Sequence, residues 1–262
     1  RGHSGAAGPP RDGQPAMTSS IWTRSYAVDT MAVTPEKRLG LVGLLRILQD
    51  IAWIHGAHLG YGFEAMMARG QIWVLARQKL VATAWPAWGE TIDVRTWVRP
   101  RAGMFVDRDY EVSHAGQPVA RGTASWVVVD AVRRRPMKFS PADMCIDDNG
   151  GLSLGITPER LPADDGLTPL MGFDVRYPDL DVNGHVNNTR YAEWLLDALP
   201  PGDRRGRVVD RYEANFLAET GVGDRVTIEA GAADADGSNR FQGRRQADGK
   251  VVFTARLGAS AA

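Results

Sequence analysis

The densest group of side chains able to do chemistry lies between residues 177 and 191. Asp181, Asn183 and His185 alternate along the chain, so in an extended segment they would project to one side. Such side chains can bind water, accept its proton and orient a carbonyl group. A helical pattern follows, and the backbone N–H groups at its start, on Val186 and Asn187, could bind an oxygen that becomes negative. The residue types alone favour the blander alternative, an Asx-rich loop that only caps the helix.

Two units of helix and strands are predicted to position this segment. Apolar residues recur at helical spacing from Leu39 to Leu59 and indicate a long helix. Strand patterns separated by turn residues follow it, at 72–82, 91–98, 104–113 and 119–129. The same order then returns, with a helix at about 186–199 and strands at 207–218, 225–231, 239–246 and 251–257.

The two units resemble copies of one another, since Gly89-Glu90 and Gly223-Asp224 each open a strand at a matching place. Short strands joined by tight turns must pair antiparallel, so we expect an α+β fold of two tandem units. In each, a long helix is wrapped by an antiparallel sheet, and the two sheets join edge to edge. The expected division is a disordered tail at 1–20, a first unit at 21–140, a linker at 141–168 and a second unit at 169–262.

Composition narrows the function. The chain has 262 residues, 44% of them hydrophobic, which is enough for a globular core. Its 31 basic and 31 acidic residues give no overall field to attract nucleic acid or an anionic membrane, and no apolar run is long enough to span a bilayer. The single Cys145 cannot form an intramolecular disulfide. His55 and His58 lack a third metal ligand, so we interpret them as packing or capping residues.

One longer run fits a known signature: Asp181-x-Asn183-x-His185-Val186-Asn187-Asn188-x-x-Tyr191, followed by Trp194. It resembles the motif of the acyl-acyl carrier protein (acyl-ACP) thioesterases, the double hotdog enzymes of bacteria and plant plastids. The resemblance extends over about residues 20–258. It implies two tandem hotdog units and an enzyme that hydrolyses fatty acyl-ACP, releasing free fatty acid and ending fatty acid synthesis.

The resemblance also implies which residues are catalytic. Family members use the Asp, Asn and His of the motif, and a Glu about thirty residues later on a strand, which Glu219 matches. In plant members a Cys often follows this Glu, whereas here the next residue is Thr220. Because the only cysteine, Cys145, lies in the expected linker, a thiol nucleophile is not expected.

Our mechanistic hypothesis is that Glu219 and His185 form a pair that positions and deprotonates water. Asn183 would orient the substrate carbonyl or the water, and Asp181 would fix the neighbouring groups. A carboxylate that attacks the thioester directly, giving an anhydride, is the alternative. The resemblance implies that neither a metal nor a cofactor takes part.

Only the second unit carries the motif, and the resemblance gives the first unit the acyl-chain pocket. The candidate pocket residues are large apolar side chains of that unit: Trp53, Met66, Met67, Trp73, Leu75 and Trp85. For any single tryptophan, ordinary core packing is the alternative.

The sharpest basic cluster consists of Arg133, Arg134, Arg135 and Lys138. Such clusters are usually a solvated face, but the expected partner, acyl carrier protein with its fatty acyl chain, is strongly acidic. Charge reversal at Arg134 should then raise KM for carrier-bound substrate far more than for a CoA thioester.

We expect no nucleic-acid partner, a monomer or homodimer, and a cytoplasmic location with the plastid as the alternative. The other functions considered are an acyl-CoA thioesterase and a non-catalytic acyl-binding protein.

Overall fold

The computed structural model describes residues 20–100, 103–138, 149–200, 207–234 and 236–261. The first unit contains β1 (Ile21–Ala27), α1 (Leu41–His58), α2 (Phe63–Ala68), β2 (Gln71–Ala82), β3 (Thr91–Pro100), β4 (Phe105–His114) and β5 (Gln117–Asp130). After η2 (Asn149–Gly151), the second contains β6 (Thr168–Asp174), η3 (Tyr177–Asp179), α3 (Asn188–Ala198), β7 (Arg207–Phe216), β8 (Arg225–Ala233), β9 (Asn239–Arg245) and β10 (Val251–Ala261). The expected tail, except for its last residue, and the linker segment with Cys145 lie outside the described residues.

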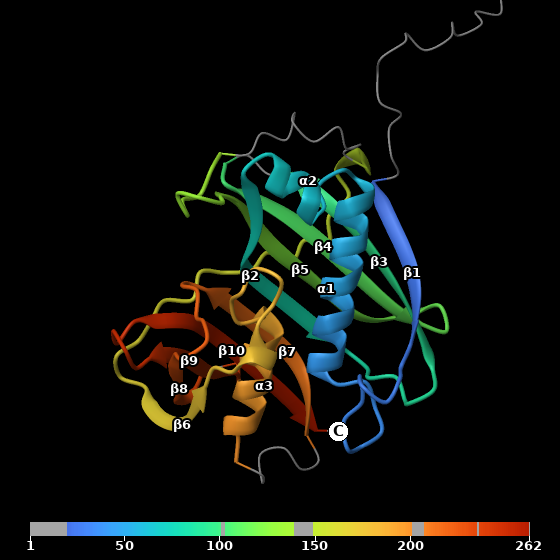
Figure 1. Ribbon diagram of the computed structural model, residues 1–262. Helices are drawn as coiled ribbons and strands as arrows, with labels where there is room; N and C mark the ends of the chain where they lie inside the picture. Colours follow the sequence, from blue (N-terminus) through green and yellow to red (C-terminus); the bar gives the residue numbers. More distant parts are fainter. Residues whose placement is uncertain (1–19, 101–102, 139–148, 201–206, 235, 262) are drawn as a thin grey trace, which may run out of the picture.

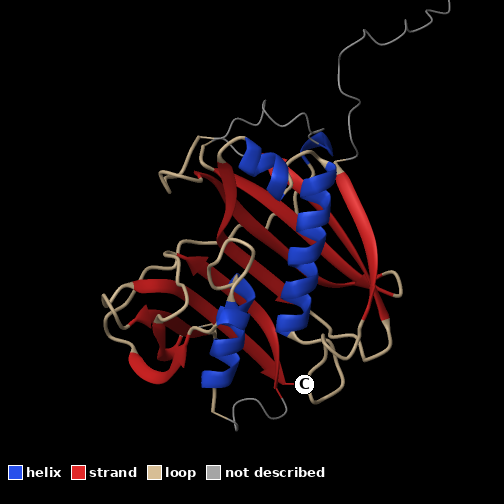
Figure 2. Cartoon of the chain, in the orientation of Figure 1, coloured by secondary structure: helices blue, strands red, loops and turns tan. Residues whose placement is uncertain are grey.

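All described strands join one ten-stranded sheet, in the order β1-β3-β4-β5-β2-β7-β10-β9-β8-β6. Each neighbouring pair is antiparallel, and the two units meet where Arg77–Val81 of β2 pairs with Arg211–Asn215 of β7. The helices α1 and α3 lie side by side on one face of this sheet (Figure 1), and the remaining segments are mostly short connections (Figure 2). The predicted α+β fold of two helix-and-sheet units is therefore confirmed.

A single main core lies between the helices and the sheet. The buried side of α1 presents Leu41, Leu44, Leu48 and Ile51, which follow the spacing that predicted the helix. From α3, Leu195 is fully buried in the same cluster. Because this core continues from one unit to the other, packing as well as strand pairing fixes the second unit against the first.

The sequence patterns missed both edge strands and α2. In β1, residues Thr23, Arg24 and Ser25 are exposed, and β6 begins with an exposed Thr168 and contains Pro169. Edge strands bury little surface and tolerate proline, so neither alternation nor an apolar run identifies them. With these two strands, the order in each unit is a strand, a long helix and four further strands.

The segment from about 152 to 165 covers the sheet face opposite the helices. Side chains on that face alternate with core residues along each strand, as the pleat requires. Four backbone N–H groups of the segment donate to them: Leu154 to Asp109, Glu159 to Glu213, Leu161 to Asn215 and Asp164 to Gln242. This part of the expected linker is thus bound along the sheet through its backbone.

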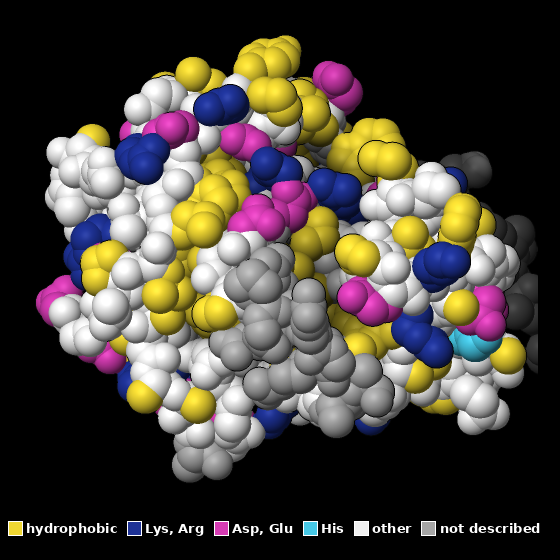
Figure 3. Space-filling model, turned by 90° about the horizontal axis from the view of Figure 1, so that it is seen from below, with side chains coloured by type: hydrophobic (Ala, Val, Ile, Leu, Met, Phe, Trp, Pro, Cys, Tyr) yellow, Lys and Arg dark blue, Asp and Glu magenta, His cyan; other side chains and the backbone are white. Residues whose placement is uncertain are grey.

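Charges of both signs are mixed on the face shown in Figure 3, where Lys and Arg side chains lie among Asp and Glu side chains. This distribution agrees with the zero net charge of the sequence. No described helix has the length and apolar character that a membrane-crossing segment needs.

Gly43 marks a close approach between α1 and the turn before it. A Cβ atom there would lie 2.3 Å from the carbonyl oxygen of Ala32, whereas a Cβ atom on Gly56 of the same helix would be 3.7 Å from the nearest atom. Helix propensity alone favours alanine at both positions. We expect Gly43→Ala to lower the free energy of unfolding by about 1–3 kcal/mol, and Gly56→Ala to raise it by about 0.5–1 kcal/mol. Urea denaturation of both variants measures the difference, and stabilisation by both would contradict the close approach.

Candidate active site

The motif segment forms a tight turn between η3 and α3. The N–H of Asp181 donates to the carbonyl of His185 at 2.8 Å, and the Asp181 carboxylate accepts from the N–H of Asn183 at 2.8 Å. Gly184, in the middle of the turn, has φ of 75°, a conformation that glycine adopts without strain. The expectation of an extended segment is therefore wrong: the Asp181 side chain closes a turn, and the turn presents Asn183 and His185 to a cavity.

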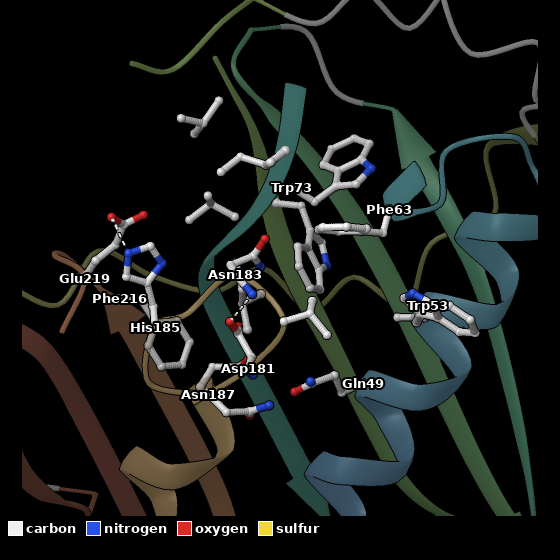
Figure 4. Close-up of a pocket in the computed structure, with 18 of the residues that line it drawn as sticks. Gln49, Trp53, Phe63, Trp73, Asp181, Asn183, His185, Asn187, Phe216 and Glu219 are labelled. Atoms are coloured by element: carbon white, nitrogen blue, oxygen red, sulfur yellow. Dashed lines mark hydrogen bonds and ion pairs between the residues drawn. The ribbon is translucent and has the colours of Figure 1, made fainter. Parts of the chain in front are cut away.

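Glu219 meets His185 from a different part of the second unit. It follows the end of β7 by three residues, so it lies in a loop and not on the strand. The guanidinium of Arg245 donates to the Glu219 carbonyl at 2.8 Å and supports this loop. The Glu219 carboxylate lies 3.3 Å from Nε2 of His185, and Figure 4 shows the imidazole between this contact and the cavity. The structure thus brings together the Glu and the His that the sequence suggested.

A side chain of the first unit completes this group. The Arg134 guanidinium pairs with Oε1 of Glu219, while Oε2 faces His185. Arg134 lies in the turn after β5, and it lines the same cavity. The three side chains are each about one-third to one-half exposed, so the group lies at the cavity mouth.

Position 220 is unsuited to a nucleophile. Thr220 is buried, does not line the cavity and shares a hydrogen bond of 2.5 Å with the Tyr191 hydroxyl. Burial raises the pKa of Tyr191 to about 12, so this hydroxyl stays protonated. The Thr220 carbonyl also accepts the N–H of Val186. The residue therefore connects the Glu219 loop to the start of α3.

The two backbone N–H groups expected to stabilise an oxyanion are occupied. Val186 donates to Thr220, as above, and Asn187 donates to the carbonyl of Asp179 at 2.8 Å. The expectation that both groups are free is wrong, because these bonds fix the loop to its neighbours. The Asn187 side chain caps α3 by accepting from Thr189. The next N–H, that of Asn188, has no acceptor among the described residues, and Asn188 lines the cavity.

A cavity of about 1080 Å³ extends from this group between the two units. Its walls include α1, the α1–α2 region and β2. The aromatic side chains of Trp53, Phe63 and Trp73 are part of these walls (Figure 4). Four of the predicted pocket residues line it: Trp53, Met66, Trp73 and Leu75. Met66 is fully buried in a cluster with Val98, Val106 and Val128, whereas Trp53 is 61% exposed at the rim.

Two predicted pocket residues lie elsewhere. Trp85 is buried in the main core, and its indole N–H donates to the carbonyl of Val209 at 2.8 Å, so it joins the first unit to β7. Met67 is 43% exposed and does not line the cavity, because it lies on the outer side of α2, whereas Met66 lies on the inner side. Helix and strand periodicity could not distinguish Trp85 and Met67 from the residues that line the cavity, since all of them are large and apolar.

Arg108, which no sequence motif singled out, is a cationic residue buried in the cavity wall. Its guanidinium lies 2.9 Å from Nδ1 of His55 and donates to the hydroxyl of Thr96 at 3.3 Å. No carboxylate among the described residues lies within 4.0 Å, and burial lowers the pKa of Arg108. His55 is itself fully buried and stacks on Trp22, so its interpretation as a packed residue is confirmed. The signal in the sequence that could have identified Arg108 is an arginine at an inward-facing position of a strand pattern.

The other members of the basic cluster remain at the surface. Arg133, Arg135 and Lys138 are exposed. Only Arg134 turns toward the cavity. Among the residues that the structure describes, no three His, Cys, Asp or Glu side chains are grouped so that they could hold a metal ion.

Two known domain families together match nearly all of this chain. The acyl-ACP thioesterase N-terminal domain matches residues 19–145, and the acyl-ACP thioesterase C-terminal domain matches residues 168–256. The chain belongs to the acyl-ACP thioesterase family. This family member carries its motif and Glu219 in the C-terminal domain, and Arg134 in the N-terminal domain.

Relatives with curated names are similar to this thioesterase family member over most of its length. A dodecanoyl-[acyl-carrier-protein] hydrolase of Cinnamomum camphora is 31% identical over 82% of this chain and 61% of its own. A palmitoyl-acyl carrier protein thioesterase of Gossypium hirsutum is 28% identical over 69% of this chain and 47% of its own. The chain spans about half the length of the first such relatives.

Solved structures share the fold of this family member. An acyl-ACP thioesterase from Bacteroides thetaiotaomicron superposes with a TM-score of 0.82 at 24% identity, over 92% of this chain and 98% of that one. A 12:0-ACP thioesterase from Umbellularia californica gives a TM-score of 0.78 at 19% identity, over 94% and 100%. The tandem hotdog architecture is thus that of the family.

Proposed function

We propose that this protein hydrolyses the thioester of fatty acyl-ACP, releasing free fatty acid and ending fatty acid synthesis. The observation that carries the proposal is the contact of 3.3 Å between His185 and Glu219, at the mouth of a cavity with a largely apolar lining. The pair of His185 and Glu219 can activate water, and the apolar cavity can hold an acyl chain. The relatives named above as acyl-ACP hydrolases and thioesterases support the same function.

In the proposed mechanism, the Nε2–H group of His185 keeps its proton and donates a hydrogen bond to the Glu219 carboxylate, which leaves Nδ1 as the basic nitrogen. Nδ1 takes a proton from water while the water oxygen bonds to the carbonyl carbon of the thioester. The tetrahedral intermediate then collapses, the carbon–sulfur bond breaks, and the imidazolium returns the proton to the leaving sulfur. The products are one carboxylic acid and one thiol.

The surroundings favour water over the Glu219 carboxylate as the nucleophile. Both carboxylate oxygens already face partners, Arg134 and His185, so neither is directed at the substrate. We propose that Asn183 orients the carbonyl or the water, and that Asp181 acts by closing the turn. The N–H of Asn188 replaces those of Val186 and Asn187 as the candidate donor to the oxyanion.

We propose acyl carrier protein as the partner and Arg133, Arg135 and Lys138 as the exposed cations that attract it. The plant relatives are named chloroplastic, which agrees with the plastid alternative, and the cytoplasmic location stays a prediction. The monomer or homodimer likewise stays a prediction. In the proposed division of 21–140 and 169–262, the first unit supplies the carrier site and much of the wall of the acyl-chain cavity, and catalysis is assigned mainly to the second unit.

Hydrolysis of one medium-chain and one long-chain acyl group, each presented on acyl carrier protein and on CoA, tests this function. We expect the wild-type protein to release acid and thiol from the ACP thioesters with the higher kcat/KM. Equal or faster turnover of the CoA thioesters would make it an acyl-CoA thioesterase. The absence of turnover with all four substrates would favour the acyl-binding protein.

A further inference from the structure

The turn after β5 has a conformation that is unusual for the residue it holds. Arg134 has φ of 53°, in the left-handed region that non-glycine residues rarely adopt. Residues held in such conformations concentrate at functional sites, where surrounding structure maintains them. The side chain presented by this backbone is the one that reaches Glu219.

Hydrogen bonds around Asp130 account for the stability of this turn. The Asp130 carboxylate accepts the N–H groups of Val132 at 2.9 Å and Arg133 at 2.7 Å. The N–H of Arg134 donates to the Asp130 carbonyl at 2.9 Å, and the Asp130 N–H donates to the carbonyl of Arg135 at 3.0 Å. The bonds from the N–H groups of Arg133 and Val132 to the carboxylate lower the pKa of Asp130 and so favour its charged form. The turn is therefore built before any substrate binds.

We propose that Arg134 is a positioning residue that the first unit supplies to the catalytic pair of the second. Its guanidinium holds Oε1 of Glu219 and thereby directs Oε2 toward Nε2 of His185. The inference rests on the proposed function, because it takes Glu219 and His185 as the pair that activates water. It replaces the earlier assignment of Arg134 to the carrier-binding cluster.

Two observations favour positioning over the other roles of an arginine. Side chains of the pair are 37% and 44% exposed, and ion pairs this exposed add little to stability. The carrier-binding role needs a guanidinium available to a partner, whereas Arg134, although exposed like Arg133 and Arg135, has its guanidinium paired with the Glu219 carboxylate in the cavity wall. This contact between the units would give the first unit, which lacks the motif, a part in catalysis.

The kinetic test compares Arg134→Gln and Arg134→Lys, with acyl-ACP and acyl-CoA as substrates. Arg134→Gln should lower kcat by about 10-fold to 100-fold with both substrates, because a small misplacement of a catalytic group has effects of this size. KM should change less than twofold, and Arg134→Lys should recover part of the kcat because the ammonium group keeps the charge. Arg121→Gln is the matched control, since Arg121 is exposed on β5 and has no ion pair among the described residues, and it should keep the wild-type kcat.

Arg134→Gln measured in the Glu219→Gln variant shows whether Arg134 acts through Glu219 or has a role of its own. Addition of Arg134→Gln there should lower kcat less than twofold further, because Arg134 acts through the carboxylate. A rise in KM for acyl-ACP alone would instead make Arg134 a docking residue, and an undiminished loss of kcat in this background would give it a role of its own. Either result overturns the proposal.

A crystal structure of Arg134→Gln tests the inference without turnover. We expect the Glu219 carboxylate to turn away from His185, so that the contact of 3.3 Å is lost. An unchanged carboxylate would overturn the positioning role even in an active enzyme. Failure of the proposed function would appear differently, as a wild-type protein that hydrolyses none of the thioesters.

Discussion

Glu219→Gln should lower kcat for acyl-ACP hydrolysis by about 10²–10⁴-fold. Glutamine has nearly the same size, so the loop and the cavity should keep their shape. Its neutral amide cannot stabilise the imidazolium that forms when His185 takes the proton of water. KM should change little, because the proposed acyl-chain site lies elsewhere in the cavity. Steady-state kinetics with a purified acyl-ACP measure both constants.

Matched variants show whether this loss belongs to the pair. Glu111→Gln removes a carboxylate that pairs with Arg95 at 3.5 Å, on β4 and away from the cavity, and should leave kcat unchanged. His185→Asn should lower kcat about as much as Glu219→Gln, and the double variant should be no worse than the more damaging single one, because the two groups act as a unit. A kcat for Glu219→Gln within tenfold of wild type would contradict the assignment.

Periodicity predicted both long helices and eight strands because each of these elements has one buried face. Thus Leu44 and Leu48 repeat at helical spacing in α1, and Ile92 and Val94 alternate with exposed residues in β3. The edge strands β1 and β6 contain no fully buried residue, although Trp22 and Phe173 pack partly against the core, and Thr168–Asp174 is exposed over most of its length. Their pairing partners, β3 and β8, are distant in the chain, which local patterns do not report.

The linker shows a second limit of sequence patterns. Proline and glycine residues correctly indicated that residues 152–165 form neither a helix nor a strand. The segment is nevertheless ordered by hydrogen bonds from its backbone, such as that of Leu161 to Asn215. Backbone groups are the same in every residue, so this mode of binding leaves no side-chain pattern.

The sequence motif predicted the side chains of the candidate site. It could not predict contacts that depend on how separate loops and the two units meet. His185 belongs to the motif, Glu219 was implied by the resemblance to the acyl-ACP thioesterases, and the structure brings the two side chains into contact. The partners of the N–H groups of Val186 and Asn187 depend on how two loops meet. The role proposed for Arg134 depends on a positive φ and on pairing between units, and a run of three arginines suggests a surface cluster instead.

Met66→Ala should shift substrate preference toward longer acyl chains. Met66 is fully buried, lines the cavity and packs against Val98, Val106 and Val128. Its truncation enlarges the cavity at an apolar wall, and an added methylene in an apolar pocket changes binding by about 1–3 kcal/mol. The ratio of kcat/KM for a chain two carbons longer than the wild-type optimum should therefore rise by about tenfold or more. A chain-length series of acyl-ACP substrates measures this ratio.

The same truncation should also destabilise the fold by about 2–5 kcal/mol, since the void is only partly refilled. Met67→Ala provides the matched control one residue away, because Met67 is 43% exposed and outside the cavity lining. It should change neither the chain-length ratio nor the midpoint of thermal unfolding. A shift caused by Met67→Ala and not by Met66→Ala would mean that the chain follows the outer side of α2. In that case the cavity between the units would not be the acyl-binding site, although the contact of His185 with Glu219 could still activate water.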